Sequence, residues 1–296
     1  MQFKPLGKSN LNVAQIAFGC MSLDLSSDNE RLLRSAADCG INLFDTADLY
    51  NCGQNETVVG NALRGIRKNV CIATKVGNEW RPDGSGWDWN PTKTYILKAV
   101  ENSLRRLQTD YIDIYQLHGG TIDDPFEEAL EAFEQLKSQG KLLNYGISSI
   151  RPNVIDHWVN RSEISSIMLQ YSLLDRRPEE QCLNWAAEKH VGVLARGSLA
   201  KGLLADKPSS SYLNWSDQEV EKVQSALSES SQRSPVHTAL RYVLQHEAVT
   251  TAVVGIRTID QLEQAVTVFD SPQLTGKEYQ TFRDILGGNQ YSDHLV

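Results

Sequence analysis

Short apolar runs alternate with longer amphipathic segments along the whole chain. Eight runs are typical of strands buried on both faces, and they cover residues 14–20, 41–46, 70–75, 111–118, 143–149, 165–171, 191–196 and 250–254. Between them, apolar side chains recur at spacings of three and four, which predicts amphipathic helices. The clearest are expected at 29–39, 90–108 and 126–140. The pattern therefore predicts strand and helix in regular alternation.

The predicted helices have recognisable start and stop signals. Pro91 with Thr92 indicates one helix start, and Pro178 before two glutamates indicates another. Gly140 is placed to end the helix that begins near Phe126. After the last apolar run, a further helix is expected to start near Thr258.

Alternation of strand and helix predicts a parallel sheet, and eight such units fit an α/β fold of the (β/α)8 TIM-barrel type. The rival, a doubly wound open sheet, usually has a glycine-rich turn after its first strand. Here the first run ends in Gly19-Cys20-Met21-Ser22, which is not such a turn. Residues 3–14 predict a small N-terminal β-hairpin with its turn near 7–10. We therefore expect one domain over 1–296, with an extra C-terminal helical segment.

Composition and charge narrow the class of protein. The 296 residues are 41% hydrophobic and 22% charged, which is ordinary for a globular protein. The net charge of −8 argues against a nucleic-acid partner, and no apolar run reaches the length of a membrane span. The first ten residues lack the apolar stretch of a signal peptide. The five cysteines have no zinc or redox spacing, so free thiols and a cytoplasmic enzyme are expected.

Four polar residues follow three successive strands. Asp45 and Tyr50 follow the second, Lys75 ends the third and His118 ends the fourth. Each alone could be structural, but the carboxyl ends of barrel strands meet at one rim, where catalytic residues lie. A lysine beside a tyrosine lowers the tyrosine pKa, a carboxylate holds the lysine, and a neutral histidine can orient a substrate oxygen. The set suits proton donation to a carbonyl that receives hydride.

These four residues resemble the catalytic tetrad of the aldo-keto reductase superfamily. The resemblance continues in the family's order through most of the chain, in the stretches Asp45-Thr46-Ala47-Asp48-Leu49-Tyr50, Gln116-Leu117-His118, Gly146-Ile147-Ser148-Ser149, Gln170-Tyr171-Ser172-Leu173-Leu174-Asp175-Arg176 and Lys201-Gly202-Leu203-Leu204. Within the superfamily, His118-Gly119-Gly120-Thr121 and the stretch 148–153 are similar to the uncharacterised bacterial oxidoreductase type. The family binds NADPH without a Rossmann domain, which agrees with the missing glycine-rich turn.

The resemblance implies where NADPH would bind. Ser148, Ser149 and Gln170 would hold the nicotinamide carboxamide, and Tyr171 would stack under the ring. The loop after the seventh strand would hold the pyrophosphate through residues that include Arg196, Ser198, Leu199 and Lys201. The segment after the eighth strand would take the adenosine 2′-phosphate and adenine through Gly255, Arg257, Thr258, Gln261 and Gln264.

Several positions depart from the family pattern. Arg196 stands where many relatives have an aromatic residue, and it either contacts the phosphates or forms a salt bridge with a neighbouring loop. Ser149 replaces a usual asparagine, Val254 a usual proline and Ala265 an adenine-contacting asparagine.

Arg257 supplies a two-pronged donor for a 2′-phosphate, so NADPH is expected over NADH.

Candidate substrate residues lie after the third strand. Trp80 and Asn78 are expected to line the substrate pocket, whereas Trp87 and Trp89 are expected to pack on the rim. Residues 207–219 read as an insertion that could form a lid over the cofactor. The polar tail, 287–296, either reaches the barrel mouth or is mobile.

The sequence therefore predicts an NADPH-dependent reductase of aldehydes or ketones, with hydride from nicotinamide and the proton from Tyr50. One alternative is an NADPH-binding sensor or regulatory subunit of the same fold. Another is a barrel enzyme with a metal held by His118, Asp45 and Asp48, but no second histidine stands at ligand spacing, so no metal is expected. The predicted partner is a small carbonyl compound, with no nucleic acid or membrane; the physiological substrate and the oligomeric state stay open.

Overall fold

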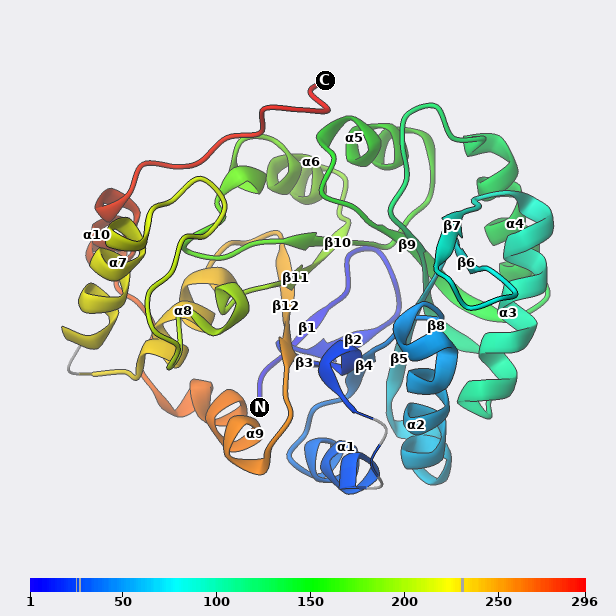
Figure 1. Cartoon of the computed structure of the whole chain (residues 1–296), viewed down its shortest axis with the longest axis horizontal. Helices are drawn as coiled ribbons and strands as arrows, with labels where there is room; N and C mark the ends of the chain where they lie inside the picture. Colours follow the sequence, from blue (N-terminus) through cyan, green and yellow to red (C-terminus); the bar gives the residue numbers. More distant parts are fainter. Residues whose placement is uncertain (25, 27, 230–231) are drawn as a thin grey trace.

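The barrel wall consists of eight parallel strands. The computed structural model describes residues 1–24, 26, 28–229 and 232–296, and its main sheet closes on itself (Figure 1). In spatial order the strands are β3 (Ile16–Gly19), β4 (Leu43–Asp45), β5 (Cys71–Val76), β8 (Ile112–His118), β9 (Leu142–Ser148), β10 (Ser166–Gln170), β11 (Gly192–Arg196) and β12 (Val249–Gly255). β12 pairs with β3 and closes the ring. The eight predicted strands and the (β/α)8 barrel are confirmed, with strand ends within two residues of the prediction.

Helices cover the outside of the barrel. Those that alternate with the strands are α1 (Asp28–Asp38), α2 (Gln54–Leu63), α3 (Lys93–Leu107), α4 (Phe126–Ser138), α5 (Pro152–Arg161), α6 (Cys182–Glu188), α8 (Pro235–Leu244) and α9 (Ile259–Val266). Thr92 and Thr258 accept hydrogen bonds from the first turns of α3 and α9, as expected for N-caps. Pro178 instead lies in a short 3-10 turn, and α6 begins only at Cys182.

Two helices stand outside the alternation. α10 (Gly276–Ile285) is the expected C-terminal helical segment, and it packs against α7 (Asp217–Glu229) at one side of the barrel (Figure 1). α7 was not predicted: the segment expected as a lid, 207–219, runs into its first turn. The part of that segment before α7 is folded by a pair of hydrogen bonds between Tyr212 and Trp215.

Two small hairpins lie at opposite ends of the barrel. β1 (Phe3–Pro5) and β2 (Asn12–Ala14) form the predicted N-terminal hairpin. It covers the barrel floor with Leu6, which is fully buried. Gly7 in its turn has a φ of +52°, and a Cβ there would lie 2.5 Å from the backbone nitrogen of Gly192. The second hairpin, β6 (Asn78–Trp80) with β7 (Trp87–Trp89), lies beside the opposite rim and was read from sequence as a loop.

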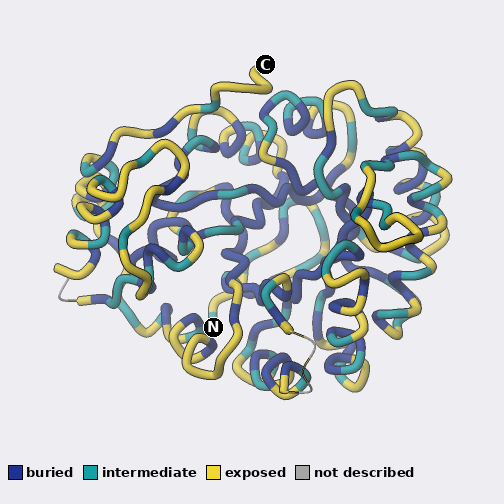
Figure 2. Tube along the Cα trace, viewed as in Figure 1, coloured by how far each residue is buried: buried dark blue, intermediate teal, exposed yellow. Residues whose placement is uncertain are grey.

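Two apolar layers form the core. One fills the barrel interior, and a larger one lies between the strands and the helices. Figure 2 shows this as a buried central wall surrounded by exposed outer loops. No helix in the described part of the chain is long and apolar enough to span a bilayer. The layers hold the strand ends in fixed positions around one rim.

The C-terminal tail follows the outer surface past α6 and α5 (Figure 1). The backbone of Tyr291 donates to Glu180, and Asn153 donates to the carbonyl of His294. The tail does not contribute to the cavity at the strand ends. It is therefore docked on the helices, which neither of the two predicted alternatives described.

Candidate active site

A cavity of about 1040 Å³ opens at the carboxyl ends of the barrel strands. It is lined by residues from the ends of β3 to β5 and β8 to β12, as expected for this architecture. Of the residues predicted from sequence, it is lined by Asp45, Tyr50, Lys75, Asn78, His118, Ser148, Ser149, Gln170, Arg196, Ser198, Leu199, Lys201, Gly255, Arg257, Gln261 and Gln264. Segments from opposite ends of the chain therefore meet in one place.

The tetrad is connected through Lys75. Its Nζ donates to Asp45 Oδ1 at 2.6 Å, to the carbonyl of Thr46 at 2.7 Å and to the Tyr50 hydroxyl at 3.4 Å. All three donors of the ammonium are thereby used, and the Lys75 side chain is buried. The His118 ring stands edge-on to the Tyr50 ring, with centroids 5.9 Å apart. The four side chains thus form one unit with fixed geometry.

Charge in the tetrad follows from burial and pairing. Burial alone would lower the pKa of Lys75, but Asp45 and Tyr50 outweigh it and raise the pKa, so the ammonium persists. Burial raises the pKa of Tyr50, although Lys75 acts against this. Lys75 thus acts on the pKa of Tyr50 in the direction expected from sequence, but burial, which the sequence argument did not weigh, outweighs it. Tyr50 therefore keeps its proton at neutral pH.

His118 is neutral. Burial, with smaller contributions from Lys75 and Arg196, lowers the pKa of His118 from 6.5 to about 3. Its Nδ1 is buried and finds no partner among the described residues. A neutral imidazole beside a protonated tyrosine can share a carbonyl oxygen with it.

The turn that carries Tyr50 is strained. Tyr50 begins a 3-10 turn in which Asn51 and Cys52 have φ values of 49° and 53°. Left-handed conformations at residues other than glycine cluster at functional sites because surrounding contacts must hold them. Behind this turn, Glu56 of α2 accepts from Thr74, the neighbour of Lys75, at 2.5 Å, and pairs with Arg106 of α3 at 2.6 Å. Packing of the helices thus fixes the turn against β5.

One half of the cavity is rich in cations. Arg196, Lys201, Lys207 and Arg257 line it, and none forms an ion pair within the part of the chain that the structure describes. The acids there are Asp206 and Asp45, and Asp45 is paired with Lys75. In a chain of net charge −8, this concentration of unpaired positive charge fits a polyanionic ligand.

The loop after β11 has a backbone held in left-handed conformations by its own hydrogen bonds. Ala200 and Lys201 have φ values of 46° and 58°, between glycines at 197 and 202 that also have positive φ. The N–H groups of Ala200 and Gly202 donate within the loop, to the carbonyls of Gly197 and Leu199 at 2.8 Å each. Arg196, at the start of this loop, donates from Nη1 to Gln170 Oε1 at 3.1 Å. The salt bridge considered for Arg196 is not formed by the described residues.

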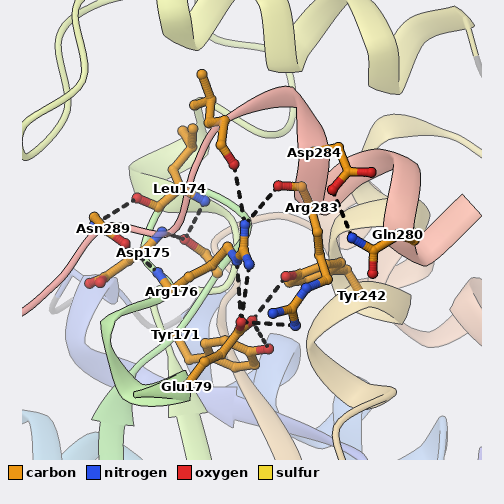
Figure 3. Close-up of polar contacts among 12 residues, drawn as sticks. Tyr171, Leu174, Asp175, Arg176, Glu179, Tyr242, Gln280, Arg283, Asp284 and Asn289 are labelled. Carbon is orange, nitrogen blue, oxygen red and sulfur yellow. Dashed lines mark hydrogen bonds and ion pairs between the residues drawn. The ribbon is translucent and has the colours of Figure 1, made fainter.

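Two of the predicted cofactor residues do not reach the cavity. Tyr171 is fully buried on the far side of the strand end, where its hydroxyl donates to Glu179 at 2.8 Å (Figure 3). Successive strand residues point to opposite sides, so Gln170 facing the cavity turns Tyr171 away from it. Thr258 is not among the lining residues either: its hydroxyl caps α9.

The aromatic residues at the rim also differ from expectation. Trp80 does not line the cavity; its indole N–H donates to the carbonyl of Leu49 at 3.2 Å. Trp87 and Trp89, predicted to pack on the rim, line the cavity instead. Trp80 and Trp87 are cross-strand partners in the β6–β7 hairpin, and the hydrogen bond to Leu49 holds the Trp80 indole away from the lining. The turn-forming residues at 82–86 were the signal for this hairpin.

Further lining residues escaped the sequence reading. Met21 and Ser22 come from the segment after β3, Arg151 from the start of α5, and Tyr212 from the segment before α7. The Ser22 hydroxyl is buried without a partner in the described part of the chain. In the described part of the chain, no three or more His, Cys, Asp or Glu side chains are grouped so that they could hold a metal ion. Asp48, considered as a metal ligand from sequence, does not line the cavity.

The chain is similar in sequence and in structure to proteins that are already known. The model of the aldo/keto reductase family matches residues 15–286. The chain belongs to this family. The aldo/keto reductase is 42% identical to the uncharacterized oxidoreductase YqkF of Bacillus subtilis, over 99% of each chain. It superposes on the holo form of the aldo-keto reductase AKR11C1 from Bacillus halodurans with a TM-score of 0.96, 46% identity and 99% coverage of each chain. As a member of the family, it is an oxidoreductase that uses a nicotinamide cofactor on small carbonyl compounds.

Relatives differ in the cofactor that their names specify. A Schizosaccharomyces pombe aldo-keto reductase named for NADP(+) is 32% identical over 66% of this chain and 61% of its own. An Escherichia coli NADH-specific methylglyoxal reductase is 30% identical over 71% of each chain. The choice between NADPH and NADH therefore has to be argued from this chain's own residues.

Proposed function

We propose that the protein reduces aldehydes or ketones to alcohols with NADPH, and that Tyr50 gives the proton. The observation that carries the proposal is the buried contact of Lys75 with both Asp45 and Tyr50 beside a neutral His118. NADPH supplies the hydride when it is bound in the cavity. The carbonyl carbon accepts this hydride while the oxygen takes the Tyr50 proton, so that C=O becomes CH–OH and Tyr50 is left as the phenolate.

The tetrad divides the work of proton transfer. The Tyr50 hydroxyl is protonated at neutral pH because burial raises its pKa. As the proton leaves, the phenolate that forms lies 3.4 Å from the Lys75 ammonium, which stabilises it. Asp45 keeps that ammonium in place, and His118 donates to the carbonyl oxygen and orients it. Lys75 thus acts on the product of proton transfer more than on the resting tyrosine.

The cavity residues fit a nicotinamide dinucleotide phosphate. Lys201 and Lys207 would face the pyrophosphate, and Arg257 would take the 2′-phosphate at the start of α9. Ser148, Ser149 and Gln170 would contact the carboxamide. With Tyr171 turned away, we assign the planar contact under the nicotinamide to the Arg196 guanidinium, which lies in the cavity next to Gln170.

The part of the cavity proposed for the substrate has apolar side chains around the polar groups of Tyr50, His118 and Asn78. Met21, Trp87 and Ile150 line it and are 66%, 46% and 42% exposed, and Asn78 adds an amide whose Nδ2 donates to the carbonyl of His118. Exposed apolar side chains around a carbonyl-binding floor fit substrates with a hydrocarbon portion. We therefore expect aldehydes and ketones with an apolar substituent to be preferred.

Replacement of Tyr50 tests the proton donor. In Tyr50→Phe we expect NADPH-dependent reduction of a panel of aldehydes to fall by about a thousandfold, since a general acid contributes about 10²–10⁴. NADPH binding, followed by tryptophan fluorescence, should change less than about threefold. The control is Tyr111→Phe, at the opposite end of the barrel.

Each result has a definite meaning. Near-full turnover by Tyr50→Phe would contradict the assignment of the proton donor. NADPH binding without turnover of any aldehyde by the unmodified protein would favour the sensing role. No binding of NADPH or NADH would contradict the proposal as a whole.

A further inference from the structure

The side-chain amide of Gln170 is held in one orientation, because hydrogen-bond acceptors face its NH₂ end and a donor faces its oxygen. Its Nε2 donates to Asp175 Oδ2 at 2.9 Å and to the Tyr212 hydroxyl at 3.0 Å, while its Oε1 accepts from Arg196 at 3.1 Å. A carboxylate accepts only, and a guanidinium donates only. The NH₂ end of the amide must therefore face Asp175, and the oxygen must face Arg196.

We propose that Asp175 is a positioning residue for the nicotinamide: it fixes the Gln170 amide so that Oε1 points into the cavity as an acceptor. Both N–H groups of Gln170 are used, whereas Oε1 keeps one free lone pair. That lone pair matches an N–H of the nicotinamide carboxamide. The inference rests on the proposed function, in which Gln170 contacts this group.

Asp175 is well suited to the task because it cannot move. It is fully buried, and the Arg177 guanidinium donates to both its carboxylate oxygens, from Nε to Oδ1 at 2.7 Å and from Nη2 to Oδ2 at 2.8 Å. Its backbone exchanges two hydrogen bonds of 3.1 Å with Ser172, which closes a tight turn directly after β10. The carboxylate therefore keeps a constant distance from the strand end that carries Gln170.

The same turn is fastened from outside by the C-terminal segment. The backbone N–H of Arg176 donates to Asn289 Oδ1 at 2.7 Å, and the Arg176 guanidinium donates to the carbonyls of Arg283 and Leu286 (Figure 3). Trp215, from the segment before α7, donates to the carbonyl of Leu174 at 2.9 Å. The turn that holds Asp175 is thus fixed by two parts of the chain far from it in sequence.

Replacement of Asp175 by asparagine isolates the orientation effect. Asparagine is similar in size, but its amide can donate or accept, so Gln170 could turn over and present NH₂ to the carboxamide. The probe pair is NADP⁺ and its 3-acetylpyridine analogue, in which a methyl group replaces the carboxamide NH₂. A third ligand, adenosine 2′,5′-bisphosphate, lacks the nicotinamide altogether. Dissociation constants are measured by calorimetry, without any turnover.

We expect the unmodified protein to bind NADP⁺ about tenfold more tightly than the acetylpyridine analogue, the size of one hydrogen bond. Asp175→Asn should reduce this ratio to about one to two, and the affinity for adenosine 2′,5′-bisphosphate should stay the same. Unchanged affinity for that ligand also shows that the variant is folded. The control is Asp284→Asn, an exposed acid of α10 near the same cluster, which should keep the tenfold ratio (Figure 3).

The double variant Gln170→Ala with Asp175→Asn shows whether Asp175 acts through Gln170. We expect it to match Gln170→Ala alone, because a residue that acts through another has no effect once that partner is gone. Equal affinities of the unmodified protein for NADP⁺ and the analogue would overturn the proposal even if Asp175→Asn did not fold. So would a ratio that Asp175→Asn leaves at tenfold. Failure of the proposed function is distinct: without a cofactor site neither NADP⁺ nor adenosine 2′,5′-bisphosphate would bind, and binding without turnover would leave the tenfold ratio and its loss in Asp175→Asn unchanged.

Discussion

At the scale of single residues, the site depends on keeping two groups uncharged next to a buried cation. Lys75 is charged, and it disfavours a second positive charge on His118. In the reaction that we propose, a neutral imidazole donates a hydrogen bond to the carbonyl without competing with Tyr50 to supply a proton. The chemistry therefore requires burial as much as it requires the residue types.

The neutral state of His118 predicts how stability depends on pH. With its pKa lowered to about 3 in the folded protein, His118 binds no proton between pH 6.5 and about 3, whereas the unfolded chain does. The free energy of unfolding should therefore fall as pH falls below 6.5. Replacement His118→Gln should make this fall shallower, by up to about 1.4 kcal/mol per pH unit.

Urea unfolding at a series of pH values from 7 to 4 measures this slope. The control is His294→Gln, an exposed histidine in the C-terminal tail, whose slope should equal that of the unmodified protein. An identical slope for His118→Gln would mean that His118 takes up a proton in the folded state over this range.

That Asp45, Tyr50, Lys75 and His118 meet at one rim could be predicted from sequence, whereas Tyr171 was misplaced, and strand geometry explains both results. Asp45, Lys75 and His118 stand at or near the ends of apolar runs, so uncertainty of a residue or two in strand boundaries still leaves them at the rim. The face of the strand on which a side chain lies is harder to predict, because a shift of one position places the side chain on the opposite face. Gln170 and Tyr171 are neighbours, and only one of them can face the cavity.

At the scale of elements, α2 and α3 approach so closely that their contact requires a glycine. A Cβ on Gly60 of α2 would lie 2.5 Å from the backbone carbonyl oxygen of Arg106 in α3. Backbone cannot give way as a flexible side chain can, so one helix would have to shift. These helices also hold the Glu56–Arg106 pair behind Thr74, the neighbour of Lys75.

Replacement Gly60→Ala should therefore lower the free energy of unfolding by about 1–3 kcal/mol, the usual cost of overpacking. The matched control is Gly276→Ala at the start of α10, where a Cβ would meet nothing within 4 Å. That change should be neutral or stabilise by up to about 1 kcal/mol, since alanine is the better helix former. Denaturant unfolding compares the two variants, and equal effects would contradict the steric argument.

Some helices and strands could not be predicted from the hydrophobic pattern of the sequence. The barrel strands were recognisable because apolar runs buried on both faces differ sharply from their surroundings. The β6–β7 hairpin is short and largely exposed, so no apolar run reveals it. α7 is amphipathic, but it follows an irregular segment with no strand before it, so the alternation that identified the other helices gave no signal.

At the scale of the whole molecule, the cavity draws on strands from both ends of the chain, so cofactor binding should stabilise the entire barrel. A ligand at one hundred times its dissociation constant adds about 2.7 kcal/mol to the free energy of unfolding. For a chain of this size that corresponds to a rise in Tm of about 5 °C. This gives a readout of cofactor choice that requires no substrate.

Arg257 should determine the preference for NADPH. We expect NADPH to raise Tm by about 5 °C at a concentration where NADH has little effect, because only NADPH offers the 2′-phosphate. Replacement Arg257→Gln should weaken NADPH binding by about 10- to 100-fold, the range of hydrogen bonds to a charged group, and leave NADH unchanged. The control is Arg31→Gln, which removes an equal charge from the exposed face of α1. A variant that lost affinity for both cofactors equally would place the 2′-phosphate contact elsewhere, since Arg257 would then act on a portion that NADH shares.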